Sequence, residues 1–174
     1  MSLGLARVPR VLGMALLFAF AGSACRDKSS PTEGASKGAP ASGSFVEVRP
    51  KPGDGPLATV LETHVEKAKA LGYLPVVELG ATWCGPCREL EESMSDARMQ
   101  AAFKATYVVH LDVDAWGGSL GAVGLGSPSI PVFIVLDEKG RGTKRRIDGS
   151  AWDDNVPANM APKLDAFFHT KVAP

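Results

Sequence analysis

A continuous apolar run at residues 132–136, with the sequence Val-Phe-Ile-Val-Leu, most strongly restricts the fold of this chain. Such a run predicts a strand covered on both faces, because a strand with one solvated face alternates apolar and polar side chains. Other strand-like runs alternate with helically spaced apolar residues along the chain. The strands are expected at 45–48, 74–79, 106–113, 132–136 and 143–147, and the helices at 59–71, 88–104 and 156–170. This pattern predicts an α/β or α+β sandwich, in which helices pack on one central sheet.

The length and charge of the chain narrow the class of protein. A length of 174 residues is consistent with one domain preceded by a targeting segment. It has 19 basic and 19 acidic residues, and its longest basic run is Lys144-Arg145-Arg146. Nucleic-acid binding needs a more basic surface, so no nucleic-acid partner is expected.

Residues 1–24 have the features of a signal peptide. Arginines precede an apolar run over 11–21, and small residues follow it. The apolar run is shorter than the roughly 20 residues that span a bilayer. Cys25 comes directly afterwards, and this arrangement resembles the lipobox of bacterial lipoproteins, in which the cysteine is lipidated and becomes the mature N-terminus. The alternative is an ordinary cleaved signal peptide followed by an unrelated cysteine.

Residues 25–44 are predicted to be the lipidated cysteine and a flexible tether. The segment after Cys25 is rich in Ser, Gly, Ala and Pro and contains no Val, Ile, Leu, Phe or Met. It cannot bury enough apolar surface to offset the entropy lost on ordering. Apolar periodicity begins at Phe45, so the folded domain is expected at 45–174.

Cys84 and Cys87 form the strongest functional motif, within a Trp-Cys-Gly-Pro-Cys sequence that follows one predicted strand and opens a helix. The helix N-terminus has unpaired N–H groups and a partial positive charge, which stabilise a thiolate on the first cysteine. The second cysteine can then close a disulfide with it. Half of a zinc site is the alternative, but zinc needs four ligands and no two of the three histidines have zinc-finger spacing. The motif therefore predicts a redox-active Cys84–Cys87 pair and no metal.

Two motifs together resemble the thioredoxin family. The sequence from Trp83 to Cys87 is the active-site sequence of thioredoxins, and Ile130-Pro131 resembles the cis-proline segment that faces their dithiol. The spacing from the first cysteine to this proline is also similar. The resemblance covers 45–174 and implies the thioredoxin fold, an α/β structure whose central mixed β-sheet has helices on both faces. It also implies thiol–disulfide oxidoreductase activity without a cofactor. An ordinary trans proline is the alternative for Pro131.

The same resemblance assigns roles around the dithiol. Cys84 is the attacking cysteine and Cys87 the resolving cysteine. Pro131 blocks metal capture, and Ile130 presents its backbone to a substrate strand. The residues expected to contact the substrate are Trp83, Gly85, Pro86 and Ile130.

Six residues before the first cysteine, thioredoxins place a buried acid that exchanges a proton with the resolving cysteine. Here that residue is Glu78, and a carboxyl group beneath the dithiol is suited to carry a proton near neutral pH. The family often places a lysine beside this acid on the adjacent strand. When residues 111–114 are matched to the family, His110 occupies the position of that lysine. His110 is therefore expected to modulate the proton affinity of Glu78. The alternatives are a solvent-facing Glu78 and a His110 with no role.

At three places the sequence differs from the thioredoxin family pattern, so the partners of this protein are expected to differ from those of thioredoxin. Glu92 replaces a proline that kinks the active-site helix, and Gly80 replaces an aromatic residue four positions before the first cysteine. Residues 115–128 contain five glycines, each of which weakens a helix by about 1 kcal/mol relative to alanine. We expect a poorly formed helix or a mobile loop beside Pro131.

The signal peptide and the dithiol together predict a compartment and a direction of reaction. The protein is expected to be extracytoplasmic, in the periplasm, and lipid-anchored to a bacterial membrane, where disulfides persist. The Gly-Pro pair between the cysteines resembles that of reducing thioredoxins, so the expected substrates are disulfide-bonded proteins, and a membrane electron-donating thiol reductase must reduce the dithiol again. The alternatives are a cytochrome-c-maturation type thioredoxin and a non-catalytic metallochaperone or assembly factor.

Overall fold

The computed structural model describes residues 44–170. The predicted signal peptide, Cys25 and the tether up to residue 43 lie outside the described residues, as do residues 171–174, so the expectations for them stay predictions. Within 44–170, no helix is long and apolar enough to cross a membrane.

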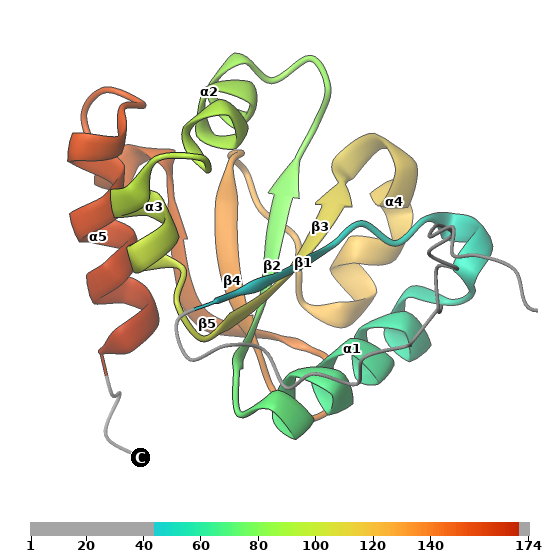
Figure 1. Cartoon of the computed structure of the whole chain (residues 1–174). Helices are drawn as coiled ribbons and strands as arrows, with labels where there is room; N and C mark the ends of the chain where they lie inside the picture. The colour runs from blue at the N-terminus through green and yellow to red at the C-terminus, as the bar shows by residue number, and fades with distance from the viewer. Residues whose placement is uncertain (1–43, 171–174) are drawn as a thin grey trace, which may run out of the picture. The chain divides into compact units, whose positions relative to one another are not determined.

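A single mixed sheet of five strands forms the centre of the described domain (Figure 1). The strands lie in the order β1-β3-β2-β4-β5; β1 and β2 both run parallel to β3, whereas β4 is antiparallel to β2 and β5. Their bounds are β1 Val46–Val48, β2 Leu74–Gly80, β3 Thr106–Asp112, β4 Val132–Leu136 and β5 Gly142–Asp148. The apolar run at 132–136 is therefore a strand of the sheet interior, buried along its whole length.

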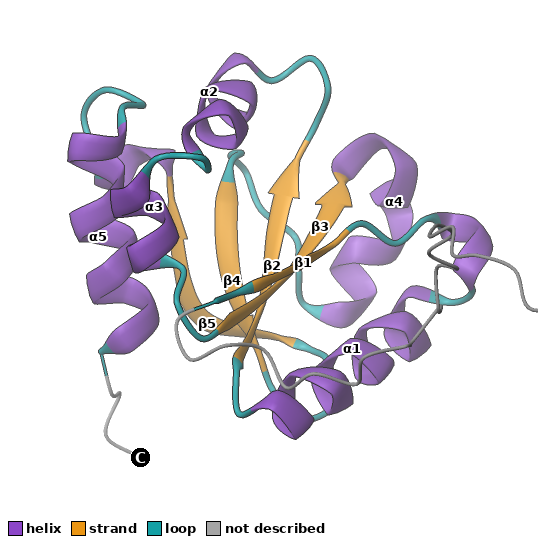
Figure 2. Cartoon of the chain, in the orientation of Figure 1, coloured by secondary structure: helices purple, strands orange, loops and turns teal. Residues whose placement is uncertain are grey.

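Helices cover both faces of the sheet (Figure 2). Helices α1 and α4 pack on one face, and α2, α3 and α5 pack on the other. Their bounds are α1 Leu57–Leu71, α2 Gly85–Ser93, α3 Ala97–Ala102, α4 Val113–Leu120 and α5 Pro157–His169. The predicted α/β class, with a mixed sheet and helices on both faces, is confirmed.

Alternation along the strands divides the core into two layers. On β2, Val77 and Leu79 face α1 and α4, whereas Val76 faces the layer with α2, α3 and α5. In that second layer Phe103, Phe133 and Phe168 form an aromatic cluster with ring centroids 4.9–5.6 Å apart. Side chains at every second position from Val76, including Glu78, therefore project toward α2, the helix that begins at the two cysteines.

The helix predicted at 88–104 is wrong in its extent, because two helices occupy this segment. Helix α2 begins at Gly85 and ends at Ser93, and α3 begins at Ala97. The side chain of Asp96 accepts a hydrogen bond from the backbone N–H of Arg98 and caps α3. An N-cap residue has extended backbone angles, so Asp96 interrupts the helical path even though the apolar spacing continues through it.

The glycine-rich segment after β3 forms short helical pieces. Helix α4 is kinked at Gly117 (φ 8°, ψ −95°), and a 3₁₀ turn, η2, follows at Gly121–Val123. Trp116 and Leu120 are nevertheless buried against α1. The expectation of a poorly formed helix agrees with this geometry. The glycines weaken the helix, and the burial of Trp116 and Leu120 stabilises it.

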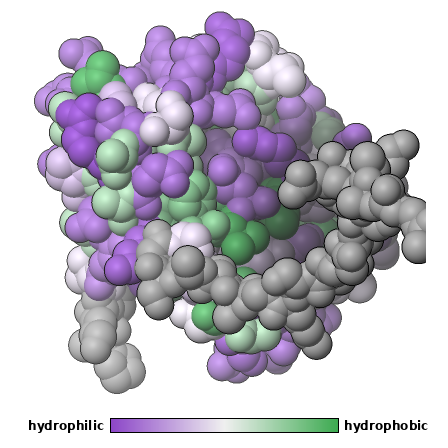
Figure 3. All heavy atoms as spheres, viewed as in Figure 1, coloured by the Kyte–Doolittle hydropathy of each residue, from purple (hydrophilic) through white to green (hydrophobic). Residues whose placement is uncertain are grey.

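Most of the surface in the view of Figure 3 is hydrophilic, with a smaller hydrophobic area near its centre. Within the described residues, the exposed large apolar side chains are Trp83 and Val156. Trp83 directly precedes the first cysteine of the dithiol, so the most exposed large apolar side chain lies beside the reactive group.

Among the glycines with a positive φ in the described residues, Gly140, in the turn between β4 and β5, is expected to be the least tolerant of a side chain. Gly140→Ala would place a methyl group 2.8 Å from the backbone nitrogen of Glu62 at φ +71°. The control is Gly72→Ala, which has a similar φ of +69° and no atom within 4 Å. Both variants impose a left-handed conformation that costs roughly 1–2 kcal/mol, and Gly140→Ala should lose about 1–3 kcal/mol more from the clash. Urea unfolding measures both losses; equal losses would contradict this packing of the turn on α1.

Candidate active site

The dithiol lies where strand β2 leads into helix α2. Cys84 is the N-cap residue of α2, and its Sγ accepts a hydrogen bond from the backbone N–H of Cys87 at 3.2 Å. Gly85 and Pro86 form the first helical turn, where the missing N–H of proline costs no hydrogen bond. The two cysteines form a disulfide with a Cα–Cα distance of 5.3 Å. In the reduced state, the free N–H groups and the dipole of α2 favour a thiolate at Cys84 over one at Cys87.

A cis peptide bond between Ile130 and Pro131 faces the dithiol. The Sγ of Cys84 lies 3.9 Å from the carbonyl oxygen of Ile130. The carbonyl of Pro131 accepts a hydrogen bond from the backbone N–H of Gly149 at 3.1 Å, which ties this segment to the end of β5. The backbone of Ile130 is thus positioned beside the sulfur of Cys84.

The indole ring of Trp83 stands beside the cysteines and is 64% exposed. Its Nε1–H donates a hydrogen bond to Oδ2 of Asp114 at 2.7 Å. Asp114 is itself fixed in the first turn of α4, whose N-cap residue Asp112 accepts a hydrogen bond from the Asp114 N–H at 2.9 Å. One edge of the ring is therefore held while its face stays open, and exposed aromatic rings of this kind are enriched at protein interfaces.

The side chain of Glu78 lies beneath the dithiol and is buried, since the residue is only 7% exposed. Gly80, two residues further along β2, leaves space around this carboxyl group. A Cβ atom at Gly80 would lie 3.0 Å from Oε1 of Glu78 and 3.6 Å from Cβ of Cys87. Glu78 and Cys87 therefore border the same small space, and a side chain at Gly80 would fill it.

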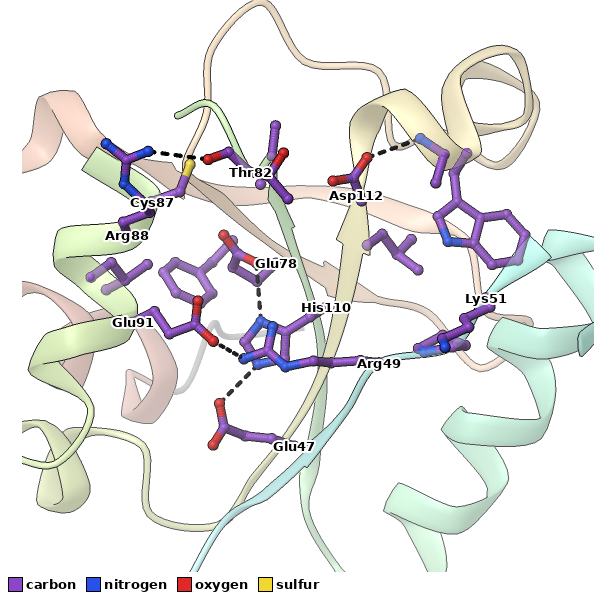
Figure 4. Close-up of a pocket in the computed structure, with 18 of the residues that line it drawn as sticks. Glu47, Arg49, Lys51, Glu78, Thr82, Cys87, Arg88, Glu91, His110 and Asp112 are labelled. Atoms are coloured by element: carbon purple, nitrogen blue, oxygen red, sulfur yellow. Dashed lines mark hydrogen bonds and ion pairs between the residues drawn. The ribbon is translucent and has the colours of Figure 1, made fainter. Parts of the chain in front are cut away.

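His110 joins Glu78 to a second acid (Figure 4). It pairs with Glu78 in the β2–β3 ladder, and its Nδ1 lies 3.1 Å from Oε2 of Glu78. Its Nε2 lies 2.8 Å from Oε1 of Glu47 on β1. Glu47 was not among the residues predicted from the sequence. The alternation at 45–48 indicates a strand, but nothing in the sequence says that this strand pairs with β3, so the contact with His110 had no sequence signal.

Hydrogen bonding within this group changes its proton affinities. Burial opposes the charged form of His110, but hydrogen bonds with Glu47 and Glu78 outweigh it and raise the pKa of His110 above 6.5. The hydrogen bond from His110 lowers the pKa of Glu47 below 4.5, against the effect of burial. The two hydrogen bonds therefore favour the positive form of His110, and the hydrogen bond from His110 favours the carboxylate form of Glu47.

A pocket of about 440 Å³ opens beside the dithiol. Its lining includes Cys87, Glu78, His110 and Glu47, but not Cys84 or the cis-proline segment. Cys87 is half-buried, whereas Cys84 is 5% exposed in the disulfide state. The Cys87 side of the dithiol thus faces a pocket of its own, separate from the surface formed by the cis-proline. Among residues 44–170, no group of three or more His, Cys, Asp or Glu side chains is placed to hold a metal ion.

The family model described as thioredoxin matches residues 59–161, a range that includes the dithiol and the cis-proline. The chain belongs to the thioredoxin family. Together with the Cys84–Cys87 disulfide, this membership identifies the protein as a thiol–disulfide oxidoreductase.

Individual thioredoxin-like proteins agree with this assignment. Thioredoxin-1 of Drosophila melanogaster is 29% identical over 106 residues, which cover 61% of this chain and 92% of the relative. Thioredoxin-1 of Drosophila yakuba is 28% identical over the same coverage. The crystal structure of a disulphide isomerase from Xylella fastidiosa Temecula1 superposes with a TM-score of 0.50 at 21% identity, covering 70% of this chain and 95% of that chain. At this identity the likeness supports the fold alone.

The Glu47→Gln variant is expected to lower the pKa of His110, because an amide stabilises an imidazolium less than a carboxylate does. Glu91→Gln is the matched control, since Glu91 borders the same pocket but pairs with Arg49. An NMR titration of the His110 ring protons measures both. If the pKa of His110 is the same in wild type and Glu47→Gln, the hydrogen bond does not exist in solution.

The raised pKa of His110 also predicts how stability depends on pH. The stabilisation from its protonated form is complete below about pH 6.5, the value for an unfolded histidine, and is lost as the pH rises through the higher folded value. His110→Asn should therefore cost more free energy of unfolding near pH 6 than near pH 9, as urea titrations can measure. A cost that grows toward high pH would contradict this sign.

Proposed function

We propose that this thioredoxin-family protein is a membrane-tethered reductase of protein disulfides that works outside the cytoplasm. The observation that carries the proposal is the position of Cys84, whose Sγ caps α2 and lies beside the Ile130 carbonyl. A substrate strand that pairs with the Ile130 backbone would bring its disulfide to this sulfur. Trp83, Gly85 and Pro86 would form the rest of the contact surface.

This geometry supports a reaction in two steps. The Cys84 thiolate attacks one sulfur of the substrate disulfide and releases the other as a thiolate, which takes a proton from water. Cys87 then gives its proton to Glu78, and its sulfur attacks Cys84 and releases the second substrate thiolate. Two electrons pass to the substrate, and the Cys84–Cys87 disulfide remains. Pro131 keeps metals from the dithiol and positions Ile130.

The location and direction rest on the sequence. The signal peptide at 1–24 and Cys25 support a lipid-anchored, periplasmic protein, and the tether to residue 44 would let the domain reach substrates near the membrane. The Gly-Pro pair between the cysteines supports the reducing direction. Because that compartment is oxidising, a membrane thiol reductase must return two electrons to the disulfide after each cycle.

Cysteine variants test which sulfur attacks. Cys87→Ser should trap mixed disulfides with substrate proteins, because the first step proceeds and the second cannot. Cys84→Ser is the matched control and should trap almost none. Non-reducing electrophoresis with mass spectrometry counts the adducts. Cys87 is the more exposed residue of the two in the disulfide state, and the reverse pattern would assign the attack to Cys87.

The anchor has its own test. Cys25→Ser in the full chain should move most of the protein from the membrane fraction to the soluble fraction, because the thiol that would carry the lipid is absent. Cys84→Ser should leave the fractionation unchanged. Membrane association that persists in Cys25→Ser would refute the lipid anchor while leaving the oxidoreductase chemistry intact.

The role of Glu78 is tested by Glu78→Gln, which keeps size and hydrogen bonding but removes the proton acceptor. General acid–base groups contribute on the order of 10²–10⁴-fold, so resolution by Cys87 should slow at least about tenfold near pH 7. The deficit should shrink at high pH, where Cys87 ionises unaided. A variant as fast as wild type from about pH 6 to 9 would remove Glu78 from the mechanism.

A further inference from the structure

Three adjacent strands place an acid, a histidine and an acid in one row beneath the dithiol. In the sheet order β1-β3-β2, His110 on the middle strand lies between Glu47 on β1 and Glu78 on β2. The three side chains project toward α2 because residues on a strand alternate between its two faces. Strand order and register, rather than a loop, therefore build this row.

The row leads from the buried side of the dithiol to the surface. The exposed fraction of the side chain rises from 9% for Glu78 through 14% for His110 to 33% for Glu47. All three border the pocket that also contains Cys87. Figure 4 shows Glu78 pointing toward His110 below Cys87, and His110 in turn reaching Glu47. Hydrogen bonds thus connect Glu78, which borders the same pocket as Cys87, through His110 to the more exposed Glu47.

We propose that His110 and Glu47 form a proton relay to solvent. For each proton that Glu78 takes from Cys87, Glu47 releases one proton to water. This inference rests on the proposed role of Glu78. Before resolution, protonated His110 donates Nδ1–H to Glu78 and Nε2–H to Glu47. When Glu78 takes the Cys87 proton, one of the two negative charges that hold His110 in its charged form disappears. His110 then passes its Nε2 proton to Glu47, and Glu47 releases it to water in the pocket.

The protons balance in both directions. One proton enters the row at Glu78 and one leaves it at Glu47, so that Glu78 and His110 end neutral and Glu47 ends ionised. When the electron donor reduces the disulfide, the flow reverses. Water protonates Glu47, His110 regains its Nε2 proton, and Glu78 returns its proton to the Cys87 thiolate.

The charges around the pocket suit this starting state. The hydrogen bonds that His110 donates to the two carboxylates outweigh burial and the repulsion from Arg49, so they raise the pKa of His110 and favour its charged form. Arg49 itself is paired with Glu91 at 2.8 Å. The other charged side chains that line the pocket are Lys51, Arg88 and Asp112. Within the described lining, Glu47 and Glu78 are thus the carboxylates bonded to His110.

Neither Glu47 nor His110 touches the reacting sulfurs, so both are positioning residues whose loss acts through Glu78. The test is a stopped-flow measurement on the reduced full chain, with Trp83 fluorescence as the signal and a disulfide peptide at saturating concentration. The first-order rate then reports the attack by Cys87. Near pH 7, Glu47→Gln should slow it roughly tenfold, whereas Glu47→Asp should keep most of the rate. Glu91→Gln, which removes a carboxylate from the same pocket, should match wild type.

Added imidazole distinguishes proton transfer from a structural effect. At constant pH and ionic strength, the wild-type rate should not depend on imidazole, because the row already carries the proton. The rates of Glu47→Gln and His110→Ala should rise with imidazole toward wild type, since the pocket admits a small base. A slow Glu47→Gln that imidazole does not restore would overturn the proposal, as would a Glu47→Gln as fast as wild type.

Glu78→Gln, measured in the same way, distinguishes failure of the Glu78–His110–Glu47 row from failure of the proposed role of Glu78. If Glu78→Gln is slow and Glu47→Gln is not, the row is refuted while the role of Glu78 stands. If Glu78→Gln is as fast as wild type, the role of Glu78 fails and the row fails with it. The mixed disulfides trapped by Cys87→Ser report on the oxidoreductase reaction independently of both.

Discussion

The hydrogen bond from the backbone N–H of Cys87 to the sulfur of Cys84 is the interaction on which the site depends. Helices usually cap their first turn with an oxygen from Ser, Thr, Asp or Asn, at a gain of about 1 kcal/mol. Here the sulfur of Cys84 takes that position, so it lies at the end of the helix where the dipole and the N–H groups favour negative charge. The sheet makes this possible, because β2 ends at Gly80 and a short turn over residues 81–84 connects it to α2. The cis-proline segment before β4 then brings the Ile130 carbonyl to the same sulfur.

The sheet has a second consequence, which concerns the cost of burying charge. A buried carboxylate without a partner would lose its hydration with nothing in return. Glu78 avoids this cost because the parallel β2–β3 register sets His110 opposite it, and β1 adds Glu47 on the far side of the ring. Gly80 leaves the carboxyl group its space next to Cys87. The pocket reaches Cys87 from a side that the cis-proline surface does not occupy.

Much of this arrangement could be predicted from the sequence, and the parts that could not have physical reasons. The apolar run at 132–136 and the motif around Cys84 have local signals, and family resemblance supplied the candidates Glu78, His110 and Pro131. The break at Asp96 was missed because the apolar spacing runs through it while the capping bond depends on one side chain. Glu47 was missed because strand order is a long-range property, and a three-residue strand carries no signal for its partner.

The most direct test of this account is the relative reactivity of the two cysteines in the reduced protein. Iodoacetamide modifies thiolates, so the rate at each sulfur near pH 7 reports its ionisation. Mass spectrometry of the peptides that contain Cys84 and Cys87 would follow both sites in one sample. With the sulfur of Cys84 at the helix N-terminus, Cys84 should react at least about tenfold faster than Cys87 near pH 7, and the difference should shrink as the pH rises. Equal rates near pH 7, or faster modification of Cys87, would contradict the account.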